Sequence, residues 1–255
     1  MLSNAQADER GRLTVGAGAF RAATWNTEWL RNTRRVPEAL AVIEAWDADV
    51  LVLTEVDEAL LGRLNLHVAR GGDDWGYGHS PGRRKVAVCS RTPWRDVDSV
   101  GHPGLPAGRY VAATTDTASG PLRVVGLCIP WRDAHVRTGR RNRVAWEDHA
   151  AYLEPLPELL KQESLRGALV VAGDLNQTVP GTRSPRPVQD LLARAFADLE
   201  ITTAGRSCGN RLLDHIAVTS HWNPLEVVLE CLAHGEAPLS DHDAVVVTLE
   251  QQASL

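Results

Sequence analysis

The sequence carries no excess of positive charge, because 27 lysines and arginines stand against 32 aspartates and glutamates. The formal net charge of −5 gives no global positive field that would draw the protein to nucleic acid or to an anionic membrane. Any polyanionic ligand must therefore be held by a local basic patch or by metal ions.

Cysteines are also few, and the four that are present lie far apart, at Cys89, Cys128, Cys208 and Cys231. No two of them have the close spacing of a zinc site. Each lies in or beside an apolar stretch, so we expect four buried, reduced thiols.

Long apolar runs are absent as well. No stretch of about 18 consecutive apolar residues occurs, so we expect no membrane-spanning helix and no membrane insertion. Residues 1–20 lack the continuous apolar run of a signal peptide. A reducing, cytoplasmic setting is therefore the expectation, and the sequence indicates no protein partner.

The sequence also has no internal repeat, low-complexity tract or linker long enough to separate two domains. We therefore predict one domain over residues 1–255, with a motif-bearing core from about 20 to 249. An apolar fraction of 44% and a charged fraction of 23% are those of a globular chain that buries a sizeable core.

Short apolar or alternating runs between Gly, Pro and Asp predict strands at residues 20–25, 50–53, 85–89, 110–115, 122–129, 168–172, 212–219, 225–229 and 244–249. Helical periodicity predicts helices at residues 35–46, 140–161 and 188–196, the second of them kinked or ended by its two prolines. Polar residues recur where apolar strands end, which is where α/β proteins commonly place their chemistry.

Five short segments carry the functional signal: 23–26 (Ala-Thr-Trp-Asn), 54–57 (Thr-Glu-Val-Asp), 172–176 (Ala-Gly-Asp-Leu-Asn), 213–216 (Leu-Asp-His-Ile) and 240–242 (Ser-Asp-His). Each is weak alone, because an Asp after a strand is often a turn former. In this order they resemble the signature set of the endonuclease/exonuclease/phosphatase superfamily. The resemblance implies an α/β (α+β) fold, a four-layer sandwich of two mixed β-sheets flanked by helices.

The same resemblance implies a divalent-metal-dependent phosphoester hydrolase that uses Mg²⁺ or Mn²⁺. Oxygen-rich sites with several carboxylates suit these ions. Glu55 resembles the principal metal ligand, and Asn26 and Asp241 would complete or orient its shell. Glu28 stands where some relatives carry a second acidic ligand, although an exposed loop glutamate is an equally ordinary interpretation.

The catalytic residues implied are Asp174, Asn176, Asp214 and His242. In extended backbone Asp174 and Asn176 point to the same side, while Leu175 points to the core. By resemblance, Asp174 positions or deprotonates the attacking water and Asn176 donates a hydrogen bond to the phosphoryl oxygen. His242 would bind the phosphate as an imidazolium or act as a general acid or base, with Asp214 holding its ring and raising its pKa.

Two neighbours of these residues are expected to be structural. Gly173 permits the close backbone approach that such a turn needs. His215 should point to the opposite face of its strand from Asp214.

One position departs from the family pattern. Cys128 stands where relatives usually show a His or Tyr that contacts the phosphate. Cys128 is either a small, weakly polar substitute, or His135 reaches in from the following loop. Next to it, Trp131 is a candidate for stacking on the substrate and Arg132 for binding its phosphate.

Arg132 belongs to a basic segment with four further arginines, at positions 137, 140, 141 and 143. One interpretation is a solvated helix start whose arginines pair with Glu147 and Asp148. The other is a substrate clamp, because arginine binds phosphate bidentately. The residues favour neither.

The favoured function is a nuclease that cleaves DNA or RNA by in-line attack of water. The alternative is a hydrolase of small or lipid phosphoesters, such as a sphingomyelinase-like or inositol-phosphate enzyme, although no apolar membrane-docking loop is evident. A silent binding module is disfavoured because Glu55, Asp174, Asn176 and His242 are all present. DNA versus RNA, and endo versus exo action, stay open.

Overall fold

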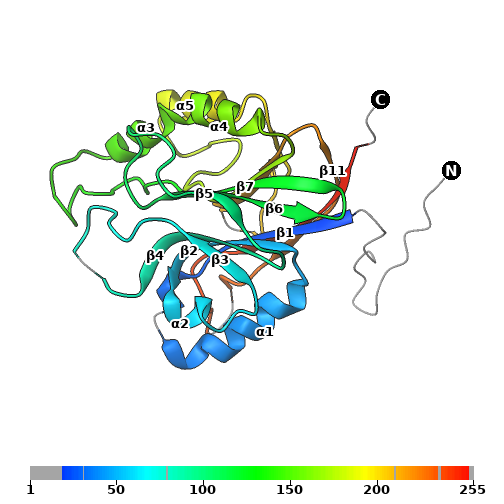
Figure 1. The fold of residues 1–255 in the computed structure, drawn as a ribbon. Coiled ribbons are helices and arrows are strands. Elements are labelled where there is room, and N and C mark those ends of the chain that lie inside the picture. The colour runs from blue at the N-terminus through cyan, green and yellow to red at the C-terminus, as the bar shows by residue number, and fades with distance from the viewer. Residues whose placement is uncertain (1–18, 31, 79, 210, 235–236, 253–255) are drawn as a thin grey trace.

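The computed structural model describes residues 19–252 except residues 31, 79, 210, 235 and 236. Two six-stranded sheets lie face to face, and helices cover the outer face of each (Figure 1). The predicted four-layer sandwich is therefore confirmed. The first 18 residues, on which the signal-peptide prediction rests, lie outside the described residues, and the single-domain organisation stays a prediction.

The first sheet has β1 near its centre, between strands from the two ends of the chain. β1 runs parallel to β2 and antiparallel to β12, so the sheet is mixed. In spatial order its strands are β11 (Trp222–Glu230), β12 (Ala244–Gln251), β1 (Ala19–Asn26), β2 (Val50–Asp57), β4 (Arg83–Ser90) and β3 (His67–Arg70).

The second sheet is also mixed, because β7 and β8 are parallel while the other neighbours are antiparallel. In spatial order its strands are β5 (Arg95–Asp98), β6 (Tyr110–Thr117), β7 (Gly120–Cys128), β8 (Leu169–Asp174), β10 (Asp214–Val218) and β9 (Glu200–Ile201).

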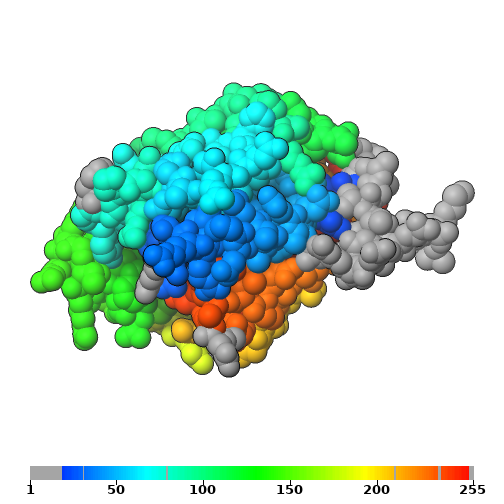
Figure 2. Space-filling model, turned by 90° about the horizontal axis from the view of Figure 1, so that it is seen from below, coloured from blue at the N-terminus to red at the C-terminus, as the bar shows by residue number. Residues whose placement is uncertain are grey.

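Helices α1 (Val36–Trp46) and α2 (Glu58–Leu61) cover the first sheet, and two short 3-10 turns, η1 (Glu28–Leu30) and η2 (Thr33–Arg35), precede them. Helices α3 (Glu147–Leu153), α4 (Leu156–Ser164) and α5 (Arg186–Ala195) cover the second sheet. The space-filling view from below shows the N-terminal segment lying beside the C-terminal one (blue and orange, Figure 2), as the central place of β1 requires.

Apolar side chains fill all three spaces between the four layers. The predicted apolar face of α1 is buried against the first sheet at Val36, Leu40, Ile43 and Trp46. Every residue of β8 is buried, as expected of a strand covered on both faces. Trp222 stacks on Phe20 at 5.6 Å in the space between the sheets.

The helix predicted at residues 140–161 is wrong at its start. Residues 140–146 form no helix, and α3 begins only at Glu147. Residues 131–146 instead make an irregular excursion that closes where the Trp146 N–H donates to the Arg132 carbonyl at 2.7 Å. Strands β3, β5 and β9 and helix α2 were not predicted, because they are short and two of the strands are rich in polar side chains.

The prediction of four reduced thiols is wrong for two of them. Cys89 and Cys128 are free and buried, but Cys208 and Cys231 form a disulfide. Cys208 lies in the loop before β10 of the second sheet and Cys231 directly follows β11 of the first. Only packing of the sheets brings their Cα atoms to 5.5 Å across 23 residues of sequence. None of the helices in the described part of the chain has the length and apolarity needed to span a bilayer.

Candidate active site

Asp174 occupies the last position of β8, and Gly173 sets its direction. Gly173 has a φ of +135°, and a Cβ atom there would lie 2.0 Å from the Leu127 carbonyl oxygen of β7. No side chain is compatible with that approach, so only glycine fits. The Asp174 carboxylate therefore lies at the edge of the second sheet, where the residue is 1% exposed.

Asn176 is locked to Asp174 by a tight local turn. Its backbone N–H donates to Asp174 Oδ1 at 2.8 Å, and its side-chain Nδ2 donates to Asp174 Oδ2 at 2.9 Å and to the Ile129 carbonyl at 2.8 Å. Its φ of +51° is uncommon outside glycine and is held by these bonds. Leu175 between them is buried in the core, so the two polar side chains share one side.

Asn26, at the end of β1, connects the first sheet to this turn. Its Nδ2 donates to Asp174 Oδ2 at 3.0 Å, and its Oδ1 accepts from the Glu28 backbone N–H at 2.9 Å. Asp174 therefore receives side-chain amides from both sheets, which fixes the orientation of its carboxylate.

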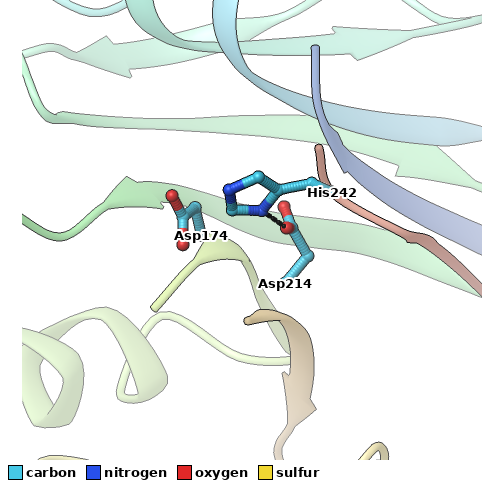
Figure 3. Close-up of side chains that lie close together, drawn as sticks. All are labelled: Asp174, Asp214 and His242. Atoms are coloured by element: carbon cyan, nitrogen blue, oxygen red, sulfur yellow. Dashed lines mark hydrogen bonds and ion pairs between the residues drawn. The ribbon is translucent and has the colours of Figure 1, made fainter. Parts of the chain in front are cut away.

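His242 enters from the loop between β11 and β12. Its Nδ1 lies 2.6 Å from Asp214 Oδ2, at the start of β10, and its ring lies between the carboxylates of Asp174 and Asp214 (Figure 3). Ser240 secures the loop, since its hydroxyl donates to the Asn26 carbonyl at 2.6 Å and accepts from the His242 N–H at 3.1 Å. Three segments far apart in sequence thus meet at one point.

Asp174, Asp214 and His242 shift one another's pKa values. Burial by itself lowers the pKa of His242, but the carboxylates of Asp214 and Asp174 outweigh it and raise the pKa to about 10. Burial raises the pKa of Asp174 to about 7 and also raises that of Asp214, with the positive charge of His242 opposing both shifts. At neutral pH His242 is therefore an imidazolium held by a carboxylate.

Glu55 lies in β2 with a φ of +45°, which turns its side chain toward the same edge. The Thr27 hydroxyl donates to the Glu55 carbonyl at 2.7 Å and holds this backbone. Lys85 Nζ lies 2.5 Å from Glu55 Oε1, and also 4.9 Å from the ring centre of Trp29. Burial by itself raises the pKa of Glu55, but Lys85 lowers it overall.

These side chains meet at a cavity of about 680 Å³. Its lining combines acidic side chains with three arginines and two tryptophans. The lining is Asn26, Glu28, Glu55, Trp131, Arg132, Asp133, Trp146, Asp174, Asn176, Gln177, Thr178, Arg183, Ser184, Arg211, Leu213, Asp241 and His242.

The acidic residues of the lining suit a divalent cation. Glu28, Glu55 and Asp241 offer carboxylate oxygens and Asn26 an amide, and hard cations prefer such oxygen donors. In addition, one ligand atom from each of Asp174, Asp214 and His242 lies within 4.8 Å of the others. This buried cluster could hold a metal ion through its two carboxylates, because the protonated ring of His242 has no lone pair to offer.

Two of the predicted substrate contacts do not line this cavity. Cys128 is 1% exposed, with the guanidinium of Arg109 3.9 Å from its sulfur, and burial raises the pKa of its thiol to about 12. His135 is buried beside a separate cavity of about 220 Å³, where its Nε2 lies 3.9 Å from Asp148 Oδ2. Trp131 and Arg132 do line the main cavity, and Trp131 is 45% exposed.

Residues of the cavity lining that the sequence analysis did not single out include Trp146, Gln177, Arg183 and Arg211. The ring of Trp146 lies edge-on to that of His149. The position of these lining residues in the sequence was the only signal that could have indicated them, because each lies in or beside a segment that precedes or follows a motif strand. No short motif marks any of them.

A buried Asp–His pair, a paired Asp and Asn on one turn and carboxylates around one cavity, on a two-sheet sandwich, define a phosphoester hydrolase. Residues 23–242 match the model of the Endonuclease/Exonuclease/phosphatase family. This match spans most of the chain, so the protein belongs to that family, and the resemblance found in the sequence is confirmed. No curated protein sequence gives a significant match.

Solved structures share the fold. The 3′ phosphatase NExo from Neisseria, bound to a product DNA hairpin, has 19% identity and a TM-score of 0.68, over 92% of this chain and 100% of that chain. The human Nocturnin catalytic domain with a bound sulfate anion has 20% identity and a TM-score of 0.67, over 92% and 94%. An endonuclease/exonuclease/phosphatase from Beutenbergia cavernae has 21% identity and a TM-score of 0.63, over 92% and 72%.

Proposed function

We propose that this enzyme is a divalent-metal-dependent phosphodiester hydrolase that cleaves nucleic acid by in-line attack of water. The observation that carries the proposal is the meeting of Asp174, Asn176 and His242 with the carboxylate of Glu55 on one cavity. Phosphoester hydrolysis needs a directed water, charge neutralisation on the nonbridging oxygens and a stabilised leaving oxygen, and these groups can supply the first two.

Mg²⁺ or Mn²⁺ is the proposed cofactor, held by Glu55 together with Asn26, Asp241 and Glu28, which line the same cavity. When bound, the ion would neutralise phosphoryl charge and stabilise the leaving oxygen. Lys85 neutralises one oxygen of Glu55 and so lowers the repulsion among these carboxylates.

Asp174 is the proposed residue that orients the attacking water and accepts its proton. The amides of Asn26 and Asn176 hold its carboxylate in one orientation, so the water would be directed without reorganisation. Asn176 is the proposed donor to a phosphoryl oxygen as its charge grows, for which its Nδ2 would exchange the hydrogen bond to Asp174 or the one to the Ile129 carbonyl.

His242 is the proposed phosphate-binding cation. Asp214 accepts from its Nδ1, so the protonated ring presents Nε2–H toward the cavity. Asp214 acts on the phosphate through this ring, by holding its orientation and its charge.

Nucleic acid is the proposed substrate because three arginines and exposed Trp131 line the same cavity as the carboxylates, where they suit a backbone phosphate and a base. The name of the NExo structure records a DNA product, which supports the same substrate class. The predicted cytoplasmic location is not supported by the Cys208–Cys231 disulfide, since disulfides persist in oxidising compartments.

The experiment is hydrolysis, with and without Mg²⁺ or Mn²⁺, of single- and double-stranded DNA, RNA, bis(p-nitrophenyl) phosphate, sphingomyelin and inositol phosphates. His242→Ala is the matched blank. We expect metal-dependent cleavage of nucleic acid that the variant loses. Preference for sphingomyelin or an inositol phosphate would instead favour the lipid or small-molecule alternative, and equal activity of His242→Ala would contradict the mechanism.

A further inference from the structure

The lining of this cavity includes three arginines that come from three different loops. Arg132 follows β7, Arg183 lies in the loop between β8 and α5, and Arg211 lies in the loop before β10. A cavity lined by both carboxylates and guanidinium groups can bind one part of an anionic ligand through a cation and another part through the arginines.

Two of these arginines have no counter-ion among the residues that the structure describes. Arg132 Nε lies 3.5 Å from Asp133, whereas neither Arg183 nor Arg211 forms an ion pair within 4.0 Å anywhere in the described residues. A guanidinium presents a planar fork of donors that matches phosphate oxygens, so an unpaired one on a cavity wall suits an anionic ligand.

The loop that carries Arg183 is held by a buried relay. His149 donates from Nδ1 to the Pro130 carbonyl at 2.7 Å, and its Nε2 accepts from Gln177 Nε2 at 2.8 Å. Gln177 Oε1 in turn accepts from the Ser184 hydroxyl at 2.6 Å. Burial lowers the pKa of His149 to about 4, so the ring stays neutral and can both donate and accept.

The segment that carries Arg211 is anchored on both sides. Leu212 is buried between the sheets, and the Leu213 carbonyl accepts from the Leu175 N–H at 2.9 Å, next to the catalytic turn. On the other side, Cys208 is covalently joined to Cys231. Arg183 and Arg211 therefore belong to loops whose positions are fixed before a ligand arrives, which lowers the entropic cost of binding.

The cavity has room for one or two nucleotides of a strand. Its volume of about 680 Å³ is that of a small-ligand pocket. Trp131, 45% exposed on the same cavity, provides an aromatic face, and bases of single strands stack on such faces without regard to sequence.

We propose that Arg183 and Arg211 form a subsite for the phosphate next to the one being cleaved, so that the substrate is a single-stranded nucleic-acid segment with a base on Trp131. The inference rests on the proposed function for the scissile phosphate, but binding at the subsite needs neither metal nor turnover.

The first test measures binding of a fluorescein-labelled oligothymidylate in EDTA by fluorescence anisotropy across salt concentrations. We expect Arg183→Gln and Arg211→Gln each to weaken binding about tenfold and to reduce the slope of log K against log salt by about 0.7, the value for one phosphate contact on a single strand. The matched control is Arg186→Gln, whose arginine does not line the cavity and pairs with Asp190 at 2.9 Å.

Equal weakening in Arg186→Gln, or unchanged binding in both cavity variants, would overturn the subsite. So would a wild-type protein that binds a duplex of the same sequence more tightly than the single strand. Tight binding of inorganic pyrophosphate without binding of the oligonucleotide would overturn the strand assignment.

The second test separates this inference from the proposed function. Bis(p-nitrophenyl) phosphate has a single phosphate, so the cavity variants should lose at least tenfold more kcat/KM on the oligonucleotide than on this diester. Equal losses on both substrates would overturn the subsite and leave the hydrolase proposal standing. Wild-type protein that cleaves neither substrate but binds the strand through Arg183 and Arg211 would overturn the hydrolase proposal and leave the subsite standing.

Discussion

Gly173 controls the direction of the catalytic carboxylate through the absence of a side chain. Its φ of +135° and the 2.0 Å between a built Cβ and the Leu127 carbonyl leave no room for alanine. Gly167 has a similar φ of +123° but nothing within 4 Å of a built Cβ. Alanine substitutions at the two positions therefore distinguish the free-energy cost of an unusual φ from that of a steric clash.

Gly173→Ala should lower the free energy of unfolding by about 3 kcal/mol or more, as severe steric clashes do, and should abolish turnover. Gly167→Ala should cost only about 1 kcal/mol, because it adds φ strain without a clash. Urea unfolding of both variants measures the difference, and equal losses would contradict the steric argument.

Asp174 illustrates a residue kept for chemistry and not for stability. Burial raises the pKa of its carboxyl to about 7, so the charge is unfavourable in the folded state. Asp174→Asn should therefore keep the free energy of unfolding within about 1 kcal/mol of wild type. Turnover should fall by about 10³-fold, because the proton acceptor is lost. Initial rates and urea unfolding of this variant measure both quantities. Activity that survives the substitution would contradict the role of Asp174 as proton acceptor.

At the scale of the elements, the disulfide joins the loop before β10 to the end of β11. Those two segments lead to Asp214 and His242 respectively. Closing 23 residues of sequence is worth about 3 kcal/mol in the unfolded-state entropy treatment.

The double variant Cys208→Ser, Cys231→Ser should lose about 3 kcal/mol of unfolding free energy and become insensitive to dithiothreitol. Wild-type protein should lose a similar amount when reduced. Urea unfolding with and without dithiothreitol measures both, and a wild-type curve unaffected by reduction would sink the prediction.

The relay through His149 makes the packing of α3 on the catalytic loops sensitive to acid. The folded-state pKa of about 4 lies below the ordinary value of 6.5, so the unfolded chain binds the proton first as pH falls. Neutral His149 therefore makes its full contribution to stability above pH 6.5. As the pH falls from about 6.5 to about 4, this contribution is lost and the free energy of unfolding decreases by about 3 kcal/mol.

Urea unfolding at about pH 7 and about pH 4.5 should show this loss in wild type, and His149→Gln should show a smaller loss over the same interval. A variant whose loss equals that of wild type would contradict the assignment to His149.

At the scale of the whole molecule, the two sheets meet at an edge whose acidic side chains repel one another without a cation. Free Mg²⁺ at about 100 times its Kd should therefore raise the free energy of unfolding by about 2.7 kcal/mol. Glu55→Gln should remove most of this gain, whereas Glu38→Gln, on exposed α1 surface, should keep it. Thermal unfolding with Mg²⁺ or with EDTA measures the shift, and an equal shift in both variants would contradict Glu55 as a ligand.

The sequence by itself determined the family, most of the strands and the order of the five motif segments, because these are local patterns. Apolar runs of four or more residues predict buried strands. Extended i, i+2 alternation was the reason given for Asp174 and Asn176 sharing one side, whereas β8 ends at Asp174 and a turn with a φ of +51° at Asn176 brings their side chains together. The short polar strands β3 and β5 escaped prediction, because packing and pairing form them and not their own composition.

Only the tertiary structure decided which loops meet. It paired Cys208 with Cys231, excluded Cys128 and His135 from the main cavity, and brought Arg183 and Arg211 to the same cavity as the carboxylates. The physical reason is that each of these outcomes depends on segments that belong to separate strands or sheets. Their distance depends on how the sheets pack and how the loops are anchored, and no local pattern along the chain encodes it.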